Sequence, residues 1–85
     1  MSAWGVYIVE SQSSGHLFTG VTTRLPWRMR ILNDGRGAKF VKGKGPWELV
    51  YWEARGTQED ALKREAEIKA LTKLQKLTLI KERHA

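Results

Sequence analysis

The feature that most constrains the fold is a pair of strand-like segments near the N-terminus, separated by small polar residues. Residues 4–11, WGVYIVES, are rich in β-branched and aromatic side chains, which favour strands. The sequence SQSSG that overlaps and follows their end is typical of a turn, and residues 16–23, HLFTGVTT, have the composition of a second strand. The sequence therefore predicts an antiparallel hairpin, on which the rest of the chain must pack.

A helix is predicted to follow the hairpin, over residues 25–33. Thr22 or Thr23 can cap its N-terminus, and Pro26 is tolerated in its first turn. The helix is expected to stop at the sequence NDG, where Gly35 suits a left-handed C-cap.

The second half of the chain adds one strand and further helices. We expect a helical turn around residues 38–42, a strand over 48–54, a helix that Thr57 opens, and a last helix that begins at the capping box TKLQ, residues 72–75. The order β-β-α-α-β-α-α predicts an α+β fold in which helices flank a small sheet. At 85 residues, the chain is expected to be one domain spanning residues 1–85.

Charge narrows the partners that such a domain can have. The net charge is +6 and the isoelectric point is about 10.0, so the protein attracts polyanions. Charge alone does not separate nucleic acid from a ribosome surface or anionic lipid. The chain has no cysteine, which excludes a disulfide framework and a thiolate metal site. No apolar run approaches membrane-spanning length, so we expect a cytoplasmic protein with no membrane partner.

One carboxylate lies where an apolar side chain would be expected. On a helical wheel of residues 57–71, the apolar side is formed by Ala61, Leu62, Ile68 and Thr72. Glu65 falls near the middle of that side. It is either half of a structural ion pair with a lysine or arginine, or a ligand for a hard divalent cation, since Mg²⁺ is often held by one or two carboxylates together with substrate phosphates.

Two other side chains are ambiguous in the same way. Arg28 projects between Ile31 and Leu32 on its helix. It either extends along apolar surface or presents a planar guanidinium to a phosphate. Tyr7, in the first strand, is by itself no more than a sheet or core residue.

A glycine-rich basic segment links the first helix to the third strand. Residues 37–47, GAKFVKGKGPW, and the preceding arginine carry a basic stripe formed by Arg36, Lys39, Lys42 and Lys44. These charges are expected to face a polyanion such as nucleic acid, while at least one of the interleaved aromatic residues, Phe40 and Trp47, is expected to be buried. His16 and His84 have no second ligand at a suitable spacing, so we interpret both as surface residues.

Together these segments resemble the GIY-YIG endonuclease superfamily, in particular its small stand-alone bacterial branch. The resemblance rests on GVY at residues 5–7, FTG at residues 18–20, Arg28 on the next helix, the glycine-basic segment, and ALKREAEIK with Glu65, in that order. It covers nearly the whole chain. A series of motifs in the right order is far more specific than any one of them.

The resemblance implies a phosphodiesterase site on one face of a three-stranded antiparallel sheet. By this resemblance, Glu65 holds a single Mg²⁺ or Mn²⁺, Arg28 steadies the scissile phosphate, and Tyr7 orients or deprotonates the attacking water. The implied activity is endonucleolytic cleavage of DNA, selective for structure rather than for sequence, because phosphate contacts position a protein without reading bases. DNA repair, recombination and restriction of foreign DNA fit equally well, as do a monomer and a dimer.

Two departures from the family pattern bear on activity. Phe18 stands where the second motif usually has a tyrosine, and Leu32 stands where the family often has a histidine or tyrosine. Removing one preorganised donor typically costs ~10²–10³ in rate. The sequence is therefore compatible with a nuclease of reduced activity or with a catalytically impaired nucleic-acid-binding module. A third interpretation is a basic protein that reaches nucleic acid only through a partner.

Overall fold

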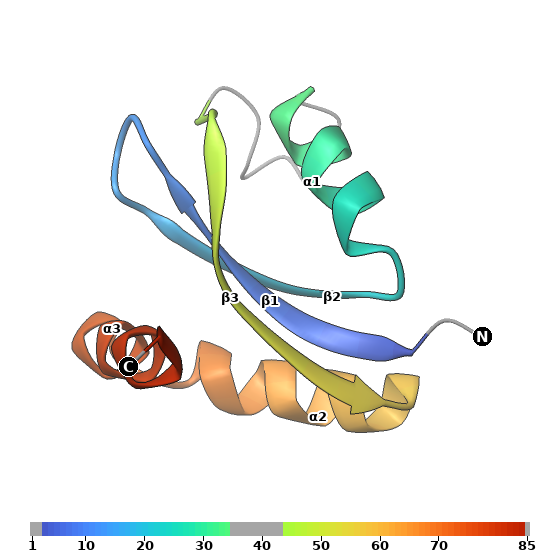
Figure 1. Cartoon of the computed structure of the whole chain (residues 1–85). Coiled ribbons are helices and arrows are strands. Elements are labelled where there is room, and N and C mark those ends of the chain that lie inside the picture. Colours follow the sequence, from blue (N-terminus) through green and yellow to red (C-terminus); the bar gives the residue numbers. More distant parts are fainter. Residues whose placement is uncertain (1–2, 35–43, 85) are drawn as a thin grey trace.

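Three strands and three helices make up the part of the chain that the computed structural model describes, residues 3–34 and 44–84 (Figure 1). In chain order they are β1 (Trp4–Ser11), β2 (Leu17–Thr22), α1 (Leu25–Asn33), β3 (Trp47–Gly56), α2 (Gln58–Lys69) and α3 (Lys73–His84). The predicted α+β class is confirmed. The helical turn expected around residues 38–42 and the C-cap expected at residue 35 lie outside the described residues.

The strands form one antiparallel sheet in the order β2-β1-β3, with β1 in the centre. Tyr7, in the middle of β1, pairs with Gly20 on β2 and with Trp52 on β3. The four consecutive residues 6–9 are completely buried. A strand covered on both faces needs apolar side chains in both directions, which explains the near-continuous apolar run of β1.

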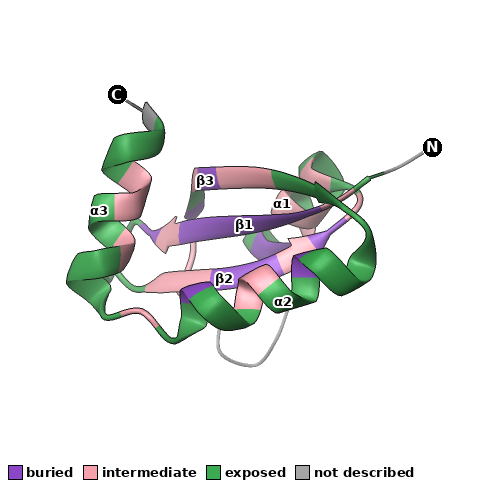
Figure 2. Ribbon diagram, turned by 90° about the horizontal axis from the view of Figure 1, so that it is seen from below, coloured by how far each residue is buried: buried purple, intermediate pink, exposed green. Residues whose placement is uncertain are grey.

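Helices cover the two faces of this sheet unequally. Helix α1 lies on one face, and α2 and α3 lie on the other, as the two views in Figures 1 and 2 agree. Alternate side chains of β1 therefore enter different cores. The α2/α3 side is built from Val6, Ile8, Tyr51, Ala61 and Ile68, and the α1 side from Tyr7, Val9, Leu32 and Trp47.

Side-chain caps fix the starts of α2 and α3 as the sequence predicts. The Thr57 hydroxyl accepts a hydrogen bond of 3.1 Å from the backbone N–H of Asp60. At α3, the backbone N–H of Gln75 donates to the Thr72 hydroxyl at 3.1 Å, and the Gln75 side-chain oxygen accepts from the Thr72 N–H at 2.9 Å. This is a reciprocal capping box, and it sets where α3 begins.

The cap predicted for α1 is wrong. The N-cap residue is Arg24, which makes no side-chain capping hydrogen bond, while Pro26 does lie in the first turn as expected. Thr22 is still part of β2, and its hydroxyl accepts from the Arg24 N–H at 3.1 Å, which stabilises the turn before the helix. The threonine therefore serves the strand-to-helix turn, because two residues separate the end of β2 from the start of α1.

The buried side of α2 is also narrower than the sequence predicts. Ala61 and Ile68 are completely buried, but Leu62 is 45% exposed and Thr72 is exposed beyond the end of the helix. Consecutive helical residues differ by about 100° in direction, so a helix that meets the sheet along the 61–68 line turns Leu62 outward.

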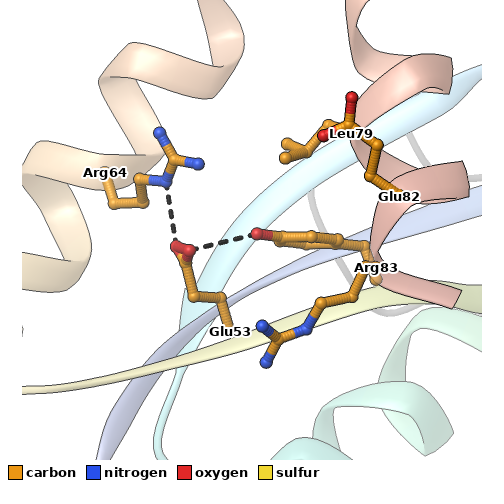
Figure 3. A pocket seen from close by; sticks show the side chains of 6 residues that line it. Glu53, Arg64, Leu79, Glu82 and Arg83 are labelled. Carbon is orange, nitrogen blue, oxygen red and sulfur yellow. Dashed lines mark hydrogen bonds and ion pairs between the residues drawn. The ribbon is translucent and has the colours of Figure 1, made fainter. Parts of the chain in front are cut away.

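A hydrogen-bonded cluster ties α2 to β3 on the α2/α3 side of the sheet (Figure 3). The Glu53 carboxylate accepts from the Tyr51 hydroxyl at 3.1 Å and from Arg64 Nε at 2.9 Å. Arg83, from α3, lies 5.9 Å from the centre of the Tyr51 ring. These groups line a pocket of about 270 Å³, and because Glu53 and Arg64 pair with each other there, the cluster holds β3 and α2 together.

No helix within residues 3–34 and 44–84 is long and apolar enough to cross a membrane.

Candidate active site

Tyr7 and Arg28, two of the predicted site residues, meet on the α1 side of the sheet. The Tyr7 side chain is completely buried, and its hydroxyl accepts a hydrogen bond of 3.2 Å from Arg28 Nη1. Tyr7 comes from the centre of β1, and half-buried Arg28 comes from the middle of α1. The arginine therefore does not merely extend along apolar surface, because one of its donors is fixed by a buried phenol.

The glycines of the two motifs make room for aromatic rings. A Cβ at Gly20 would lie 2.6 Å from Tyr7 Cζ and closer still to the Tyr7 hydroxyl. A Cβ at Gly5 would lie 2.5 Å from Cζ2 of Trp52 and 2.8 Å from the backbone oxygen of Glu53. Real Cβ atoms do not approach so closely, so any other residue at position 20 would displace the tyrosine.

Burial sets the protonation state of Tyr7. Desolvation raises the pKa of its hydroxyl above the ordinary 10.0, although the hydrogen bond and the positive charge of Arg28 act in the opposite direction. The phenol is therefore protonated near neutral pH. Its oxygen accepts from Arg28, so the buried phenol holds that guanidinium in place.

Glu65 lies on α2, the helix that covers the other face of the sheet from α1. Its side chain is 19% exposed, and its cationic neighbour is Lys69 of the same helix, with Nζ 3.4 Å from the carboxylate and 53% of that side chain exposed. Among the described residues, no hydrogen bond joins Glu65 to Tyr7 or Arg28. Its negative charge nevertheless contributes to raising the pKa of Tyr7, so its field reaches that hydroxyl.

The two departures from the family pattern are apolar side chains of the core around Tyr7. The Phe18 ring lies 6.5 Å from the Tyr7 ring and 6.3 Å from the Trp47 ring, between centroids. Leu32 is 2% exposed in the same core. These positions supply packing where a hydroxyl or imidazole would supply a donor.

The predicted basic stripe is described only at one end. Lys44 is half-buried, and its backbone oxygen accepts from the hydroxyls of Ser11 and Ser13. Trp47 is 3% exposed, which confirms that an aromatic residue of this segment is buried. The remaining members, Arg36, Lys39, Phe40 and Lys42, lie outside the described residues. Of the two histidines, His16 is exposed and its ring lies 2.7 Å from the Ser14 hydroxyl, while the side chain of His84 is not described.

A second feature of α1 was not expected from the sequence. Arg24, Pro26, Trp27 and Arg30 line a hollow of about 410 Å³ on the outside of the helix. Trp27 is 46% exposed. The available signal was the spacing of three residues between Arg24, Trp27 and Arg30, which places them on one helical face.

The donors present fit a cation held mainly by water and substrate rather than by a protein cage. Within the described part of the chain, no group of three histidine, cysteine, aspartate or glutamate side chains could hold a metal ion. A single, mostly buried carboxylate such as Glu65 is what Mg²⁺ uses when phosphates complete its coordination.

Comparison with known sequences identifies the family. The sequence model of the GIY-YIG catalytic domain matches residues 3–78. The chain belongs to the GIY-YIG family. Membership in this family of nuclease domains supports a nuclease role in general, and GIY-YIG nucleases generally use divalent metal ions.

Relatives of this GIY-YIG protein extend over its whole length. UPF0213 proteins of Staphylococcus aureus strains Mu50 and N315 are each 47% identical over 83 residues, which covers 98% of this chain and all of theirs. The solution NMR structure of a UPF0213 protein from Bacillus halodurans is 36% identical, with a TM-score of 0.58 over 95% of this chain and 84% of that one. The predicted resemblance to a small GIY-YIG protein and the predicted fold are both confirmed.

Proposed function

We propose that this protein is a metal-dependent endonuclease that hydrolyses phosphodiester bonds in DNA, with selectivity for structure rather than sequence and with reduced activity. The observation that carries the proposal is the Arg28–Tyr7 hydrogen bond of 3.2 Å. It fixes one guanidinium donor beside a protonated phenol, and within residues 3–34 and 44–84 no carboxylate forms an ion pair with Arg28. The remaining donors of Arg28 therefore stay available for an anion.

Each residue has a distinct role in this proposal. The free guanidinium donors of Arg28 bind the scissile phosphate, where planar bidentate geometry suits two phosphate oxygens. The Tyr7 hydroxyl, which stays protonated, holds Arg28 in position through their hydrogen bond. It acts as a positioning group rather than as a base, because burial opposes loss of its proton.

Glu65 is the residue that would hold Mg²⁺ or Mn²⁺. When bound, the cation supplies charge relief at the leaving oxygen of the phosphodiester. The exposed Lys69 ammonium, 3.4 Å from this carboxylate, would give way to the cation, since an exposed pair within one helix contributes little to stability.

DNA is the proposed substrate because the charge and the donors both suit a polyanion. The net charge of +6 favours association with nucleic acid, and the proposed contacts are to phosphate. Such contacts do not read sequence, so selectivity is expected to follow the shape of the DNA, as in branched, nicked or single-stranded forms.

A second candidate is a nucleic-acid-binding module that has lost most of its catalytic power. The packing of Phe18 against Tyr7 and Trp47 favours it, because a hydroxyl that the family usually supplies is replaced by core packing. This module would keep the Arg28 phosphate site and the basic charge while cutting little or nothing.

The decisive experiment measures cleavage of labelled branched, nicked and single-stranded DNA in the presence of Mn²⁺ or Mg²⁺. Arg28→Ala and Glu65→Gln should each lower the rate by ~10²–10³. Glu67→Gln is the matched control, since Glu67 lies on the same helix but is 60% exposed and pairs with Arg64, so that variant should cut like the wild type. Cleavage that survives both Arg28→Ala and Glu65→Gln would exclude the nuclease proposal.

Restoring the missing donors separates the two candidates. Phe18→Tyr combined with Leu32→His should raise cleavage markedly if the chain is a nuclease that lacks only polar groups. A wild type and a restored variant that both bind DNA without cutting it would identify the binding module.

A further inference from the structure

We propose that the hollow on the outside of α1 is a stacking site for one unpaired base of a nucleic acid strand whose neighbouring phosphate is held by Arg28. We call this hollow, lined by Arg24, Pro26, Trp27 and Arg30, the α1 subsite. The inference rests on the proposed function and sharpens its substrate class to single-stranded nucleic acid, or to a duplex with an unpaired nucleotide at the cut.

The exposure of Trp27 is the first observation. Its side chain is 46% exposed, whereas Trp47 is 3% exposed and Trp4 and Trp52 are partly buried and pack against the two cores. Trp27 belongs to neither core. A large aromatic ring that is left at the mouth of a hollow of about 410 Å³ offers a flat surface to a ligand.

The charges beside that ring are the second observation. The Arg24 guanidinium lies 5.5 Å from the centre of the Trp27 ring, and Arg30 lies one helical turn further along the same face. Among the described residues, no carboxylate forms an ion pair with Arg24 or Arg30, and α1 itself contains no acidic residue. An aromatic ring with one arginine over one of its faces and a second arginine one helical turn away, neither of them paired with a carboxylate among the described residues, suits a base flanked by phosphates.

Position links this subsite to the candidate active site. Trp27 and Arg28 are consecutive, so their Cα atoms are about 3.8 Å apart. Arg28 turns inward to the Tyr7 hydroxyl while Trp27 turns outward to the hollow. One strand that crosses α1 would therefore contact the two residues at different positions, with a phosphate at Arg28 and a base at Trp27.

The stacking geometry selects an unpaired base. In a duplex each base already stacks on its neighbours and is paired, so a ring on a rigid helix cannot lie against its face without disrupting the duplex. In a single strand every base has an open face, and stacking on an aromatic side chain is largely independent of sequence. The α1 subsite thus adds selectivity for strand state without adding base recognition.

Binding measured without metal tests the inference apart from cleavage. The measurement is fluorescence anisotropy of one labelled oligonucleotide, single-stranded and as its duplex, in the presence of a chelator. Trp27→Ala should weaken single-strand binding roughly 5- to 150-fold, the loss expected for one stacked base, and leave duplex binding almost unchanged. Trp27→Phe should keep most of the single-strand affinity. An RNA strand of the same sequence, measured alongside, shows which sugar the site prefers.

Leu74→Ala is the matched control for the loss of an exposed apolar side chain. Leu74 is 73% exposed on α3, on the other side of the sheet, so this variant should bind every oligonucleotide like the wild type. If Trp27→Ala binds single strands as well as the wild type does, or loses single-strand and duplex affinity equally, the inference is wrong. In that case the exposed ring serves another partner, such as a protein.

An abasic scan gives a sharper criterion. A single abasic nucleotide is moved along the strand, and the affinity of wild type and Trp27→Ala is measured at each position. The wild type should lose affinity most at one position relative to a fixed 5′ or 3′ end, and that loss should disappear in Trp27→Ala. A loss that persists in Trp27→Ala would assign the stacking to another residue.

The two proposals fail in different ways. If Trp27→Ala loses single-strand affinity while cleavage is absent or independent of Glu65 and Arg28, the subsite stands and the nuclease proposal falls. If cleavage depends on Glu65 and Arg28 but Trp27→Ala keeps its affinity for single strands, the nuclease proposal stands and the subsite falls.

Discussion

The arginines on the two faces of the sheet differ in whether a carboxylate pairs with them. On the α2/α3 side, Arg64 lies 2.9 Å from Glu53 and 3.1 Å from Glu67, and Arg55 lies 3.8 Å from Glu53. On the α1 side, Arg24, Arg28 and Arg30 form no ion pair with any carboxylate of the described residues. Arg55 and Arg64 are thus paired with carboxylates of the fold, whereas Arg24, Arg28 and Arg30 have no carboxylate partner among the described residues and can receive an anion from outside.

This difference shows where a net charge of +6 can act. A paired arginine contributes little to the field outside the protein, because its carboxylate partner cancels it at a distance. Arg28 and Arg30 of α1 and Arg24 at its N-cap together make this end of the molecule locally positive, and Arg28 contacts the Tyr7 hydroxyl. The comparison therefore favours the α1 face as the side that meets a phosphate backbone.

The largest effect on stability is expected from adding a side chain at Gly20, where the Tyr7 ring occupies the space that a Cβ would need. Gly20→Ala would place a Cβ 2.6 Å from Tyr7 Cζ, and the ring has no room to move because it is completely buried. We expect a loss of about 3 kcal/mol in the free energy of unfolding, measured by urea denaturation.

A double variant checks that explanation. In a Tyr7→Ala background the clash no longer exists, so Gly20→Ala should cost much less than it does in the wild type. Additive losses would mean that the glycine is needed for some reason other than the tyrosine ring.

Smaller losses of stability are expected at the two partly buried glutamates, Glu53 and Glu65, and they should differ in size. Glu53→Gln removes the carboxylate that Arg64 and Tyr51 share, so unfolding should become easier by roughly 1–3 kcal/mol. Glu65→Gln removes only a contact with the exposed ammonium of Lys69 in the same helix, so the metal-free protein should keep its stability to within about 0.5 kcal/mol.

Thermal melts of both variants, with and without Mg²⁺, measure this difference. Mg²⁺ should stabilise the wild type and Glu53→Gln but not Glu65→Gln. A large loss of stability in metal-free Glu65→Gln would instead make that glutamate a structural partner and would remove it from the proposed site.

The smallest effect concerns stability at high pH. Burial raises the folded-state pKa of Tyr7 above 10.0, so the folded protein holds this proton more tightly than the unfolded chain does. The resulting stabilisation is complete below pH 10 and is lost as the pH rises through the folded-state pKa. The free energy of unfolding should therefore fall more steeply with pH in the wild type than in Tyr7→Phe.

Tyr51→Phe should remove a separate share of that slope, since burial also raises the pKa of Tyr51. The denaturation series should run across pH 8 to 11, beside an ultraviolet titration of the phenols. An unchanged slope in Tyr7→Phe would contradict the raised pKa.

The sequence predicted those parts of the fold that local patterns determine. The bounds of β1 and α1 agree with the predicted ranges, and the caps at Thr57 and Thr72 form as expected, because each depends on residues three or four positions apart. The cap of α1 and the exposure of Leu62 were predicted wrongly. Both depend on how a helix leaves or meets the sheet, which no local pattern states.

Less of the candidate site than of the fold could be predicted from the sequence. The helical wheel slightly favoured an Arg28 that covers apolar surface over one that holds a phosphate. Only the arrangement of α1 over β1 reveals its hydrogen bond to Tyr7, 21 positions away. The α1 subsite was not predicted from the sequence, because aromatic residues in helices usually face a core. The spacing of Trp27 with Arg24 and Arg30 becomes informative once both cores are seen to be complete without it.

The pairing of Tyr7 with Gly20 across β1 and β2 has a consequence for how such chains can diverge. A sheet alternates the direction of its side chains, so a slip of one residue would turn the tyrosine away from the arginine and bring a bulky neighbour against it. The turn between the strands can therefore lengthen or shorten freely, provided that the same two residues still face each other. The tyrosine ring and the glycine that makes room for it must therefore change together, whereas the number of residues between them need not stay fixed.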